Sequence, residues 1–467
     1  MHKLNDIFKE YEPIPIKDVK TDSREVEKQD ISVATHGFNV DHSEYIEDAI
    51  NNGAAAIVTD IDYETNIPCI KVDDVEKSLS EICKKLYDYN NDLNLIGITG
   101  TDGKTTTATI LKNILNKFSN TAYIGTNGIE YKDKKIKTEN TTPKKEELYK
   151  IFSDLKKENC SNVVMEVSSE ALLHNRVDSF LYKYAIFTNI TEDHLNVHKT
   201  IDSYISSKLK LLDYLTDDGT IIVNKDDENC KEIISSNNKI FTYGKDENSD
   251  FQICDINYKE KYTTFTIRHN NKKYKIKSPY PFEYNIYNLT AAFIVCYLEK
   301  LNHRKVIKYI KKLKPIMGRC EYLDFNQKYK VILDYAHTEN GIRNLIENVK
   351  KNNQKIIVVT GSAGGRETEK RSRIGKYLLN NVDLVVFTMD DPRNESVDDI
   401  IDQMIGEEKN NNYIRIQNRE QAIFYALDIA EENDYVLIIG KGRDNYMAIG
   451  DERIDYCDYD VIYKYFN

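Results

Sequence analysis

A glycine-rich turn followed by lysine and threonine is the segment with the clearest chemistry in this sequence. Leu95, Ile96 and Ile98 form a short apolar run typical of a buried strand, and Gly100 and Gly103 then open a turn that a helix over 105–115 can follow. Glycine lets backbone N–H groups approach phosphate oxygens, while a helix N-terminus and the Lys104 ammonium add positive charge. Thr105 is placed to offer its hydroxyl to a phosphate-bound Mg²⁺. The segment predicts a cradle for the phosphates of ATP; the alternative is an ordinary glycine turn with an exposed lysine.

Two polar segments follow other apolar strands and carry groups that suit a metal or phosphate site. Glu166 lies near the end of the apolar run 163–167, where a carboxylate suits Mg²⁺ or has a purely structural role. Residues 187–198 contain one Glu, one Asp and two His. They fit a metal or phosphate site, or equally a solvated helix start with Thr191 as its N-cap. No cysteine accompanies them, which disfavours zinc.

A lysine at helical spacing is a further candidate. Thr200, Tyr204 and Lys208 are spaced i, i+4 and i+8, which places them on one face of a helix. A lysine that faces Mg²⁺ and phosphates has a lowered pKa, and its neutral amine can react with CO₂ to give a carbamate. From the spacing alone, an ordinary surface lysine is the default interpretation.

Four loops in the last third of the chain each follow an apolar strand. They cover residues 334–338, 361–366, 390–393 and 440–444, and their arginines and aspartates could bind a zwitterionic ligand. Active residues of parallel sheets gather at the carboxyl ends of strands. Each loop alone is also compatible with ordinary turn chemistry.

The composition indicates a globular protein of several domains. The 467 residues are too many for one core and indicate about three domains. The net charge of −11 argues against a non-specific nucleic-acid binder, and no run approaches the roughly 18 apolar residues of a membrane span. The eight cysteines are scattered without a CxxC pair, which indicates reduced thiols. We therefore expect a cytoplasmic protein that binds neither nucleic acid nor membranes.

Alternating apolar runs and helical segments predict an α/β fold in three blocks, 1–92, 93–315 and 316–467. Helices are expected at 44–52 and 71–89 in the first block. The strands expected in the other two blocks cover residues 122–124, 163–167, 185–188, 221–223, 331–334, 356–360, 384–388 and 435–439, with antiparallel strands within 251–277.

Seven motifs occur in the order seen in the Mur ligase family, which the chain resembles over essentially its whole length. They are Gly-Thr-Asp-Gly-Lys-Thr-Thr at 100–106, Asn-Thr-Thr-Pro at 140–143, Glu-Val-Ser-Ser at 166–169, Thr-Asn-Ile-Thr-Glu-Asp-His-Leu at 188–195, Asp-Tyr-Ala-His-Thr at 334–338, Lys-Arg at 370–371 and Gly-Lys-Gly at 440–442. The chain looks most like the members that add the third residue to the peptidoglycan stem peptide. Residues 21–24 resemble the uridine-nucleotide-binding start of those members.

The resemblance implies a three-domain α/β protein. An N-terminal UDP-binding α/β domain (1–92) precedes a central P-loop ATPase with a parallel sheet and antiparallel strands (93–315), and a C-terminal Rossmann-like domain (316–467) brings the amino acid. The implied cofactors are ATP and Mg²⁺, and the implied substrates are UDP-MurNAc-L-Ala-D-Glu and a diamino acid. ATP would convert the D-Glu side-chain carboxylate to an acyl phosphate, which the amine of the amino acid attacks. We expect a monomer.

The resemblance also assigns residues by position. The nucleotide would contact Gly100, Thr101, Asp102, Gly103, Lys104, Thr105, Thr106, Asn288, Arg319 and Asp334. Mg²⁺ would be bound by Thr105, Glu166, His194 and a carbamylated Lys208. The catalytic residues would be Lys104, Glu166, His194 and the carbamylated Lys208. The UDP substrate would contact Ser23, Asn140, Thr141, Thr142, Ser168, His174 and Arg176. The amino acid would contact Arg366, Asp391, Arg393, Gly440 and Asp444.

Several positions depart from the family pattern. Asp102 stands where Asn is usual and could cap the following helix or contact Mg²⁺, while Glu170 and Glu339 replace a usual His and Pro. Asp391 replaces the Asn of Asp-Asn-Pro-Arg but Arg393 is kept, and Arg443-Asp444 replaces His-Glu. Because a distal carboxylate needs a cationic partner, Arg393 favours meso-diaminopimelate over L-lysine.

Two other functions stay open at this point. One is a related amide ligase acting on another substrate, such as a folate polyglutamate, cyanophycin-type or pseudomurein enzyme. The other is a non-catalytic binding paralogue, against which the set of Lys104, Glu166, His194 and Lys208 argues.

Overall fold

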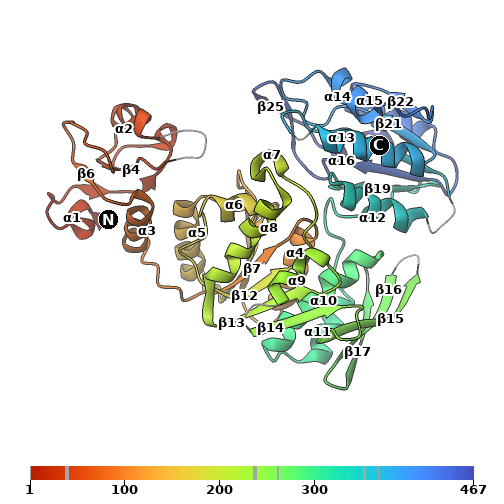
Figure 1. Cartoon of the computed structure of the whole chain (residues 1–467), viewed down its shortest axis with the longest axis horizontal. Coiled ribbons are helices and arrows are strands. Elements are labelled where there is room, and N and C mark those ends of the chain that lie inside the picture. The colour runs from red at the N-terminus through yellow and green to blue at the C-terminus, as the bar shows by residue number, and fades with distance from the viewer. Residues whose placement is uncertain (1, 37–41, 235–238, 260–261, 351–353, 367) are drawn as a thin grey trace.

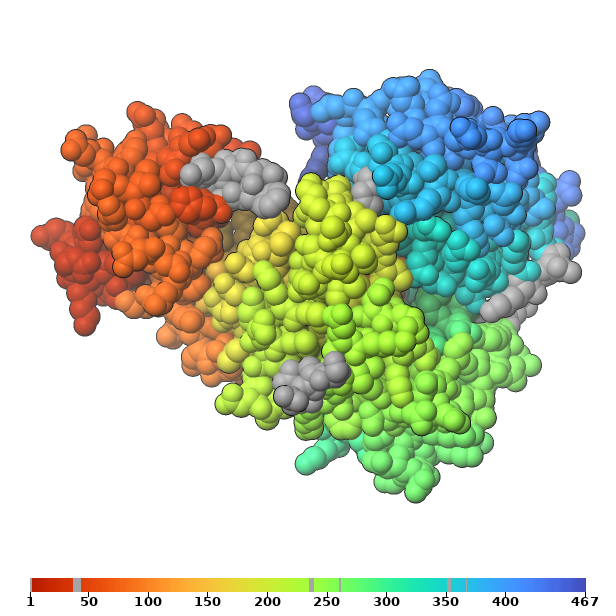
Figure 2. All heavy atoms as spheres, in the orientation of Figure 1, coloured from red at the N-terminus to blue at the C-terminus, as the bar shows by residue number. Residues whose placement is uncertain are grey.

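Three α/β units follow one another along the chain, each built around its own sheet (Figure 1). The structure, a computed structural model, describes residues 2–36, 42–234, 239–259, 262–350, 354–366 and 368–467. In the space-filling view, the N-terminal and C-terminal units lie on either side of the central unit (Figure 2). The predicted fold class is confirmed. No helix among the described residues is long and apolar enough to cross a membrane.

The N-terminal unit is a small parallel sheet with helices. Its strands run in the order β3 (Val19–Lys20), β4 (Ile31–Val33), β5 (Ala56–Thr59) and β6 (Cys69–Lys71), beside a separate pair β1 (His2–Lys3) and β2 (Pro15–Ile16) and the helix α1 (Leu4–Ile7). The helix expected at 44–52 is confirmed as α2 (Ile46–Asn51). The helix expected at 71–89 is wrong at its start, because β6 pairs with β5 there and Asp74 caps α3 (Val75–Leu86).

The central unit is a large mixed sheet, with eleven strands among the described residues. Their order is β10 (Lys134–Ile136), β9 (Gly128–Tyr131), β8 (Thr121–Gly125), β11 (Asn162–Glu166), β7 (Asn94–Thr99), β12 (Tyr182–Phe187), β13 (Leu215–Asn224), β14 (Lys239–Gly244), β15 (Phe251–Lys259), β16 (Tyr262–His269) and β17 (Lys272–Ser278). The strands from β8 to β15 are parallel. The expectation of antiparallel strands within 251–277 is confirmed, because β16 pairs antiparallel with both β15 and β17. β15 also pairs in parallel with β14, which joins these strands to the parallel part of the sheet.

Helices cover both faces of the central sheet, so its strands are apolar on both sides. Adjacent residues of β7 belong to different cores: Leu95 packs with the α5 face, and Ile96 packs with the α4 and α10 face. The first core also takes in apolar residues of the N-terminal unit. The helices of this unit are α4 (Lys104–Leu115), α5 (Lys145–Lys157), α6 (Ser169–Leu173), α7 (Leu195–His198), α8 (Ile201–Leu209), α9 (Lys231–Ile234), α10 (Glu283–Leu298) and α11 (His303–Ile310).

The C-terminal unit is a parallel sheet with one antiparallel edge strand. The order is β18 (Glu321–Leu323), β19 (Lys330–Asp334), β23 (Tyr435–Ile439), β20 (Ile356–Thr360), β21 (Leu384–Phe387) and β22 (Tyr413–Arg415), and β18 is the antiparallel strand. One apolar core includes α12 (Glu339–Lys350), α13 (Glu369–Asn381) and α14 (Val397–Ile405). The other includes α15 (Arg419–Asp428) and α16 (Asp458–Phe466), and a hairpin of β24 (Tyr446–Ile449) and β25 (Glu452–Asp455) precedes α16.

Candidate active site

The glycine-rich turn joins β7 to α4 as a compact loop whose lysine folds back onto it. Gly100 has a φ of +145°, and a side chain there would overlap the Thr188 hydroxyl. Lys104 Nζ donates to the carbonyl oxygens of Gly100 and Thr101, both at 2.8 Å. Asn189 holds the loop from outside, since its Oδ1 accepts from the Asp102 N–H at 2.9 Å and its Nδ2 donates to the Asp102 carbonyl at 3.0 Å. Burial lowers the pKa of Lys104.

Glu166 ends β11, the strand beside β7, and its fully buried carboxylate faces the start of α4. Its oxygens accept from Tyr123 Oη at 2.5 Å, from Thr105 Oγ1 at 2.8 Å and from the Thr126 N–H at 3.1 Å. Burial raises the pKa of Tyr123, so its hydroxyl stays protonated as a donor. The site therefore fixes a carboxylate and a threonine hydroxyl side by side, which are hard oxygen ligands of the kind Mg²⁺ prefers.

A cavity of about 370 Å³ opens beside this loop, between the central and C-terminal units. Its lining includes six residues predicted to hold the nucleotide: Asp102, Gly103, Thr106, Asn288, Arg319 and Asp334. Arg319 Nη2 donates to Thr105 Oγ1 at 3.0 Å, and its guanidinium lies over the Tyr335 ring at 4.6 Å. Its buried Nε has no hydrogen-bond partner among the described residues. A half-buried guanidinium whose Nε is buried and unpaired fits a phosphate ligand.

Lys208 lies under the phosphate loop, although it is far from it in sequence. Thr200 caps α8 by accepting from the Ser203 N–H, and Tyr204 and Lys208 share the buried face, as predicted. Lys208 is 1% exposed; its Nζ donates to the Gly100 carbonyl at 2.9 Å and lies 4.3 Å from the centre of the Tyr204 ring. Burial, and secondly the charge of Lys104, lower the pKa of Lys208 well below its usual value. The interpretation as an ordinary surface lysine is therefore wrong.

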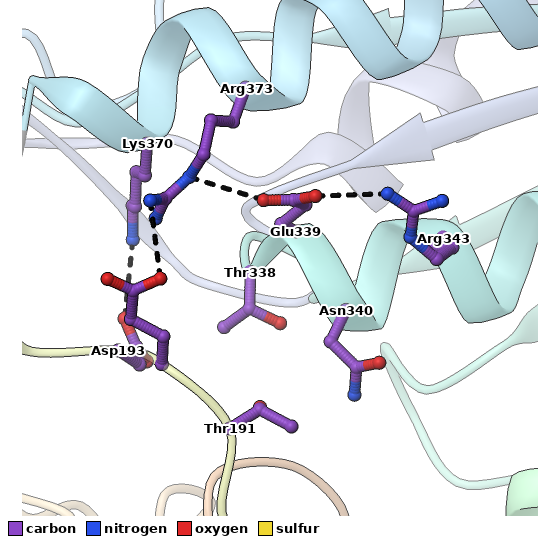
Figure 3. A pocket seen from close by; sticks show the side chains of 9 residues that line it. Thr191, Asp193, Thr338, Glu339, Asn340, Arg343, Lys370 and Arg373 are labelled. Carbon is purple, nitrogen blue, oxygen red and sulfur yellow. Dashed lines mark hydrogen bonds and ion pairs between the residues drawn. The ribbon is translucent and has the colours of Figure 1, made fainter. Parts of the chain in front are cut away.

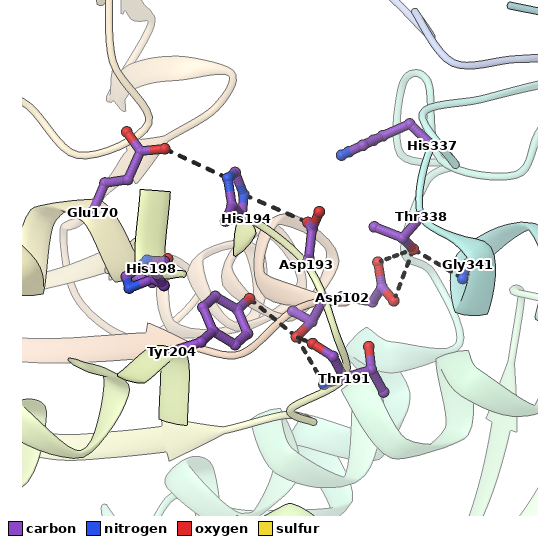
Figure 4. Close-up of polar contacts among 12 residues, drawn as sticks. Asp102, Glu170, Thr191, Asp193, His194, His198, Tyr204, His337, Thr338 and Gly341 are labelled. Atoms are coloured by element: carbon purple, nitrogen blue, oxygen red, sulfur yellow. Dashed lines mark hydrogen bonds and ion pairs between the residues drawn. The ribbon is translucent and has the colours of Figure 1, made fainter. Parts of the chain in front are cut away.

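The loop before α7 presents His194 between two carboxylates (Figure 4). His194 Nδ1 lies 3.4 Å from Glu170 Oε1, and its Nε2 lies 3.5 Å from Asp193 Oδ2. Burial lowers the pKa of His194 to about 3, so the imidazole is neutral near pH 7. The alternative of Thr191 as a helix N-cap is wrong, because His194 itself, at a φ of +55°, precedes the helix.

Asp102 contacts the C-terminal unit and does not cap α4, whose N-cap is Gly103 without a side-chain bond. The two oxygens of Asp102 accept from Thr338 Oγ1, both at 3.3 Å (Figure 4). One of them also accepts from Asn340 Nδ2 at 3.4 Å. The cap proposed from the sequence is therefore wrong. A carboxylate of the phosphate loop instead joins two units of the chain.

Most residues predicted for the UDP substrate gather next to Glu166. Thr142 Oγ1 donates to the Glu166 carbonyl at 2.9 Å and accepts from the Ser168 N–H at 3.0 Å, while Arg176 Nη1 donates to the Thr142 carbonyl at 3.2 Å. Thr141 Oγ1 lies 3.3 Å from Thr126 Oγ1. Asn140 is half-buried just before them, and burial lowers the pKa of the half-buried His174.

Ser23 lies apart from that group, in a short 3-10 segment of the N-terminal unit. This segment is tied to α5 by polar contacts on either side of Ser23. Thr21 Oγ1 donates to Glu146 Oε1 at 2.6 Å, and Lys144 Nζ pairs with Glu25 Oε1 at 2.6 Å.

The residues predicted for the amino acid follow β21 and β23 of the C-terminal sheet. Asp391 Oδ1 accepts from the buried Lys441 Nζ at 2.7 Å, so the carboxylate that replaces the usual Asn is compensated. Gly440 packs so closely on Asp390 that a side chain would overlap its carboxylate. Burial raises the pKa of Asp444 to about 6.

The two predicted arginines lie in neighbouring loops of the same sheet. Arg393 Nη1 donates to the Gly364 carbonyl at 2.8 Å, which holds the guanidinium beside the loop after β20. Arg366 is exposed in that loop. Together with the preceding residues, the structure brings five predicted positions to the carboxyl ends of adjacent parallel strands.

The roles of three residues in this region were not predicted from the sequence. Asn189 hydrogen-bonds to the phosphate loop, and Lys441 neutralises Asp391. Asp193 pairs at 3.5 Å with Nζ of Lys370, a residue of the C-terminal unit. Their signal was present, because all lie within the motifs quoted above. Their partners could not be assigned without the three-dimensional arrangement.

Comparisons with known proteins cover nearly the whole chain. Residues 98–296 match the Mur ligase middle domain, and residues 318–442 match the family model described as Mur ligase, glutamate ligase domain. UDP-N-acetylmuramoyl-L-alanyl-D-glutamate--2,6-diaminopimelate ligase 2 of Clostridium acetobutylicum is 34% identical, with 96% of this chain and 95% of that protein aligned. The 2,6-diaminopimelate ligase of the same type from Fusobacterium nucleatum is 35% identical, with 95% and 92% aligned.

Solved structures of ligases have the same fold as this chain. A structure of UDP-N-acetylmuramoyl-L-alanyl-D-glutamate--2,6-diaminopimelate ligase superposes with a TM-score of 0.68 at 25% identity and covers 99% of this chain and 98% of its own. The fold is also that of the MurF ligase from Thermotoga maritima in complex with ADP, with a TM-score of 0.68, 20% identity and 91% and 93% of the chains covered.

Proposed function

The chain belongs to the Mur ligase family, and on that premise we propose that it is an ATP-dependent ligase of peptidoglycan precursor synthesis. It would join the D-Glu side-chain carboxylate of UDP-MurNAc-L-Ala-D-Glu to meso-diaminopimelate. The observation that carries this proposal is the buried Lys208 amine, 2.9 Å from the Gly100 carbonyl of the phosphate loop, whose residues Asp102 and Gly103 line the cavity of about 370 Å³. The names of the relatives that align along the whole chain supply the substrates.

The reaction must make a carboxylate reactive, because a free carboxylate does not acylate an amine. The D-Glu side-chain oxygen attacks the γ-phosphorus of ATP, the bond to the β–γ bridging oxygen breaks, and ADP leaves. During this transfer, Lys104 and Arg319 stabilise the charge of the phosphoryl group, mainly by electrostatics and position. The amine attacks the acyl phosphate, loses a proton and expels inorganic phosphate.

Mg²⁺ fits this site because Thr105 and Glu166 already present two oxygens 2.8 Å apart. We propose that these two residues, with the neutral His194 and a carbamylated Lys208, hold the metal ions. When bound, Mg²⁺ neutralises phosphate charge. The depressed pKa of Lys208 supports the carbamate, because only the neutral amine adds to CO₂.

The three units divide the substrates among them in this proposal. Residues 1–92 would bind the uridine nucleotide through Ser23, residues 93–315 would hold ATP, and residues 316–467 would bring the amino acid. We propose that the protein acts as a monomer in the cytoplasm. Its eight free cysteines are compatible with a reducing compartment.

Arg393 is the residue we propose to recognise the distal carboxylate of diaminopimelate. Replacing it (Arg393→Ala) removes a charged partner, and we expect the KM for diaminopimelate to rise about 10- to 100-fold, as for loss of one charge-assisted contact. The KM for ATP should stay within about twofold. Steady-state kinetics at saturating ATP measure both, and an unchanged KM for diaminopimelate would remove this assignment.

Asp444 predicts a pH dependence of amino-acid binding. Its raised pKa of about 6 means that the carboxylate is largely protonated at pH 5 and ionised at pH 7. Because an ammonium binds the ionised form, we expect the KM for the amino acid to fall as the pH rises from 5 to 7. Asp444→Asn should flatten this profile. Asp444→Asn should also raise the free energy of unfolding at pH 7 above that of the wild type. Because folding raises the pKa of Asp444, the wild type loses stability as this carboxylate ionises.

The proposal as a whole is tested by supplying the purified protein with UDP-MurNAc-L-Ala-D-Glu and ATP, and with diaminopimelate, lysine or ornithine in separate reactions. We expect ADP release and a new amide product with diaminopimelate. A product with another acceptor would change the substrate, and no ADP release with any of them would support a non-catalytic paralogue.

A further inference from the structure

A network of charged side chains joins the C-terminal unit to the loop that presents His194 (Figure 3). Arg373 on α13 lies at its centre. Its Nη1 pairs with Glu192 Oε2 on the loop at 3.2 Å. Its Nε lies 3.3 Å from Glu339 Oε2 at the start of α12, an ion pair without hydrogen-bond geometry. Glu339 Oε1 also accepts from Arg343 Nη2 at 3.0 Å. One arginine thus connects two helices of the C-terminal unit with a loop of the central unit.

The same loop is held at two further points. Next to Glu192, the buried Asp193 pairs with Lys370 Nζ at 3.5 Å, one helical turn before Arg373. From the phosphate-loop side, Thr101 Oγ1 accepts from the Thr191 N–H at 2.9 Å. These contacts surround a cavity of about 230 Å³ whose charged lining contains three basic and three acidic side chains. Two of the acidic side chains come from the loop of the central unit, and the other four charged side chains come from α12 and α13 of the C-terminal unit.

The backbone of His194 explains why the loop needs support from both sides. Its φ of +55° lies in the left-handed region, which residues other than glycine rarely adopt. Such a conformation persists where surrounding contacts determine it. Two of the ion pairs that fix the preceding residues come from α13, so the shape of this loop depends on the C-terminal unit.

We propose that Arg373, oriented by Glu339, is a positioning residue that holds the 191–194 loop, and with it His194, in its reactive arrangement when the C-terminal unit is docked. Glu339 is where the family pattern has Pro, which has no carboxylate to orient an arginine. The bridge through Glu339 is therefore a departure of this chain from that pattern. The inference rests on the proposed function, because the reaction it assists is that of the ligase.

The test is a double-mutant cycle of Arg373→Ala and Glu192→Ala, with kcat and KM measured at 50 and 500 mM KCl. We expect Arg373→Ala, which removes two partly exposed ion pairs, to lower kcat about fivefold, and Glu192→Ala, which removes one of them, to lower it about threefold. The double variant should lose no more than the worse single variant, because the two residues act as one pair. High salt should lower kcat of the wild type and leave that of Arg373→Ala nearly unchanged.

A structural role of Arg373 makes a different set of predictions. Lys376→Ala is the matched control, since Lys376 lies on the same helix and pairs with Glu408 within the C-terminal unit at 3.6 Å. It should leave kcat unchanged, and Arg373→Lys should restore part of the loss. Equal losses in Arg373→Ala and Lys376→Ala, additive losses in the cycle of Arg373→Ala and Glu192→Ala, or a fall in Tm without a fall in kcat would overturn the proposal.

A second readout separates this inference from the proposed function. Mg-ADP binding to Arg373→Ala, measured by calorimetry, should stay within about twofold of wild type, because the phosphate loop keeps its own contacts with Asn189. Small-angle scattering of the wild type should show looser packing of the units at 500 mM KCl, and scattering of the variant should show it already at 50 mM. Unchanged scattering would overturn the inference even if another ligase substrate were found.

Discussion

Replacing Lys208 by alanine is expected to reduce turnover about a thousandfold, equivalent to about 4 kcal/mol of transition-state stabilisation. The reason is geometric: the amine is buried at 2.9 Å from the Gly100 carbonyl, where a carbamate would place an anionic oxygen beside the phosphate loop. Short-chain carboxylic acids added to the Lys208→Ala protein should restore part of the activity, because they can supply the missing oxygen. Single-turnover ADP release with and without acetate measures both effects.

Lys210→Ala is the control for this prediction. Lys210 is two residues further on, half-buried, and donates to the Leu172 carbonyl at 3.4 Å, so its loss should change turnover less than about twofold. Wild-type enzyme incubated with ¹³C-labelled bicarbonate should show a carbamate resonance that Lys208→Ala lacks. Full activity of Lys208→Ala, or no resonance in an active wild-type sample, would count against the modified lysine.

Replacing Lys104 by alanine is the second change with a large expected effect. Its amine bonds to the Gly100 and Thr101 carbonyls, which places its charge inside the loop where phosphates would lie. Removing a cation preorganised for a transferring phosphoryl group costs on the order of a thousandfold in kcat. Mg-ATP affinity should fall as well, because ground-state phosphates share the contact. Pre-steady-state phosphoryl transfer and calorimetry separate the two effects.

Lys112 is the matched control for Lys104, because it lies on the same helix, α4. Its Nζ is 3.3 Å from Glu130 Oε2, on the far side from the loop, and Lys112→Ala should keep kcat within about twofold. A Lys104→Ala protein that transfers phosphate at the wild-type rate would show that the loop does not bind the triphosphate. A loss shared equally by Lys112→Ala would indicate that α4 had been destabilised.

The central features of the fold were predictable because buried parallel strands leave a clear pattern. Most residues of the runs at 94–99, 163–167 and 435–439 are apolar, and consecutive apolar side chains pack into cores on opposite faces, since helices cover both faces of their sheets. Short edge strands leave no such pattern. The strand Lys134–Ile136 is exposed along its whole length, and its pairing with β9 depends on a neighbour that local sequence does not reveal.

The candidate site was predictable wherever chemistry depends on neighbours along the chain. The phosphate loop is local, and helical spacing correctly placed Lys208 on the same face as Tyr204. The role of Asp102 could not be predicted, because its partners Thr338 and Asn340 are 236 and 238 residues away. The same holds for the pairing of Asp391 with Lys441, which requires the carboxyl ends of β21 and β23 to meet.

The most direct test of the account follows oxygen atoms through one turnover. If the carboxylate is activated as an acyl phosphate, its oxygen must leave with the phosphate when the amine attacks. UDP-MurNAc-L-Ala-D-Glu labelled with ¹⁸O in the D-Glu side-chain carboxylate should therefore give inorganic phosphate that carries one labelled oxygen for each amide formed. Amide formation with unlabelled phosphate would contradict the account.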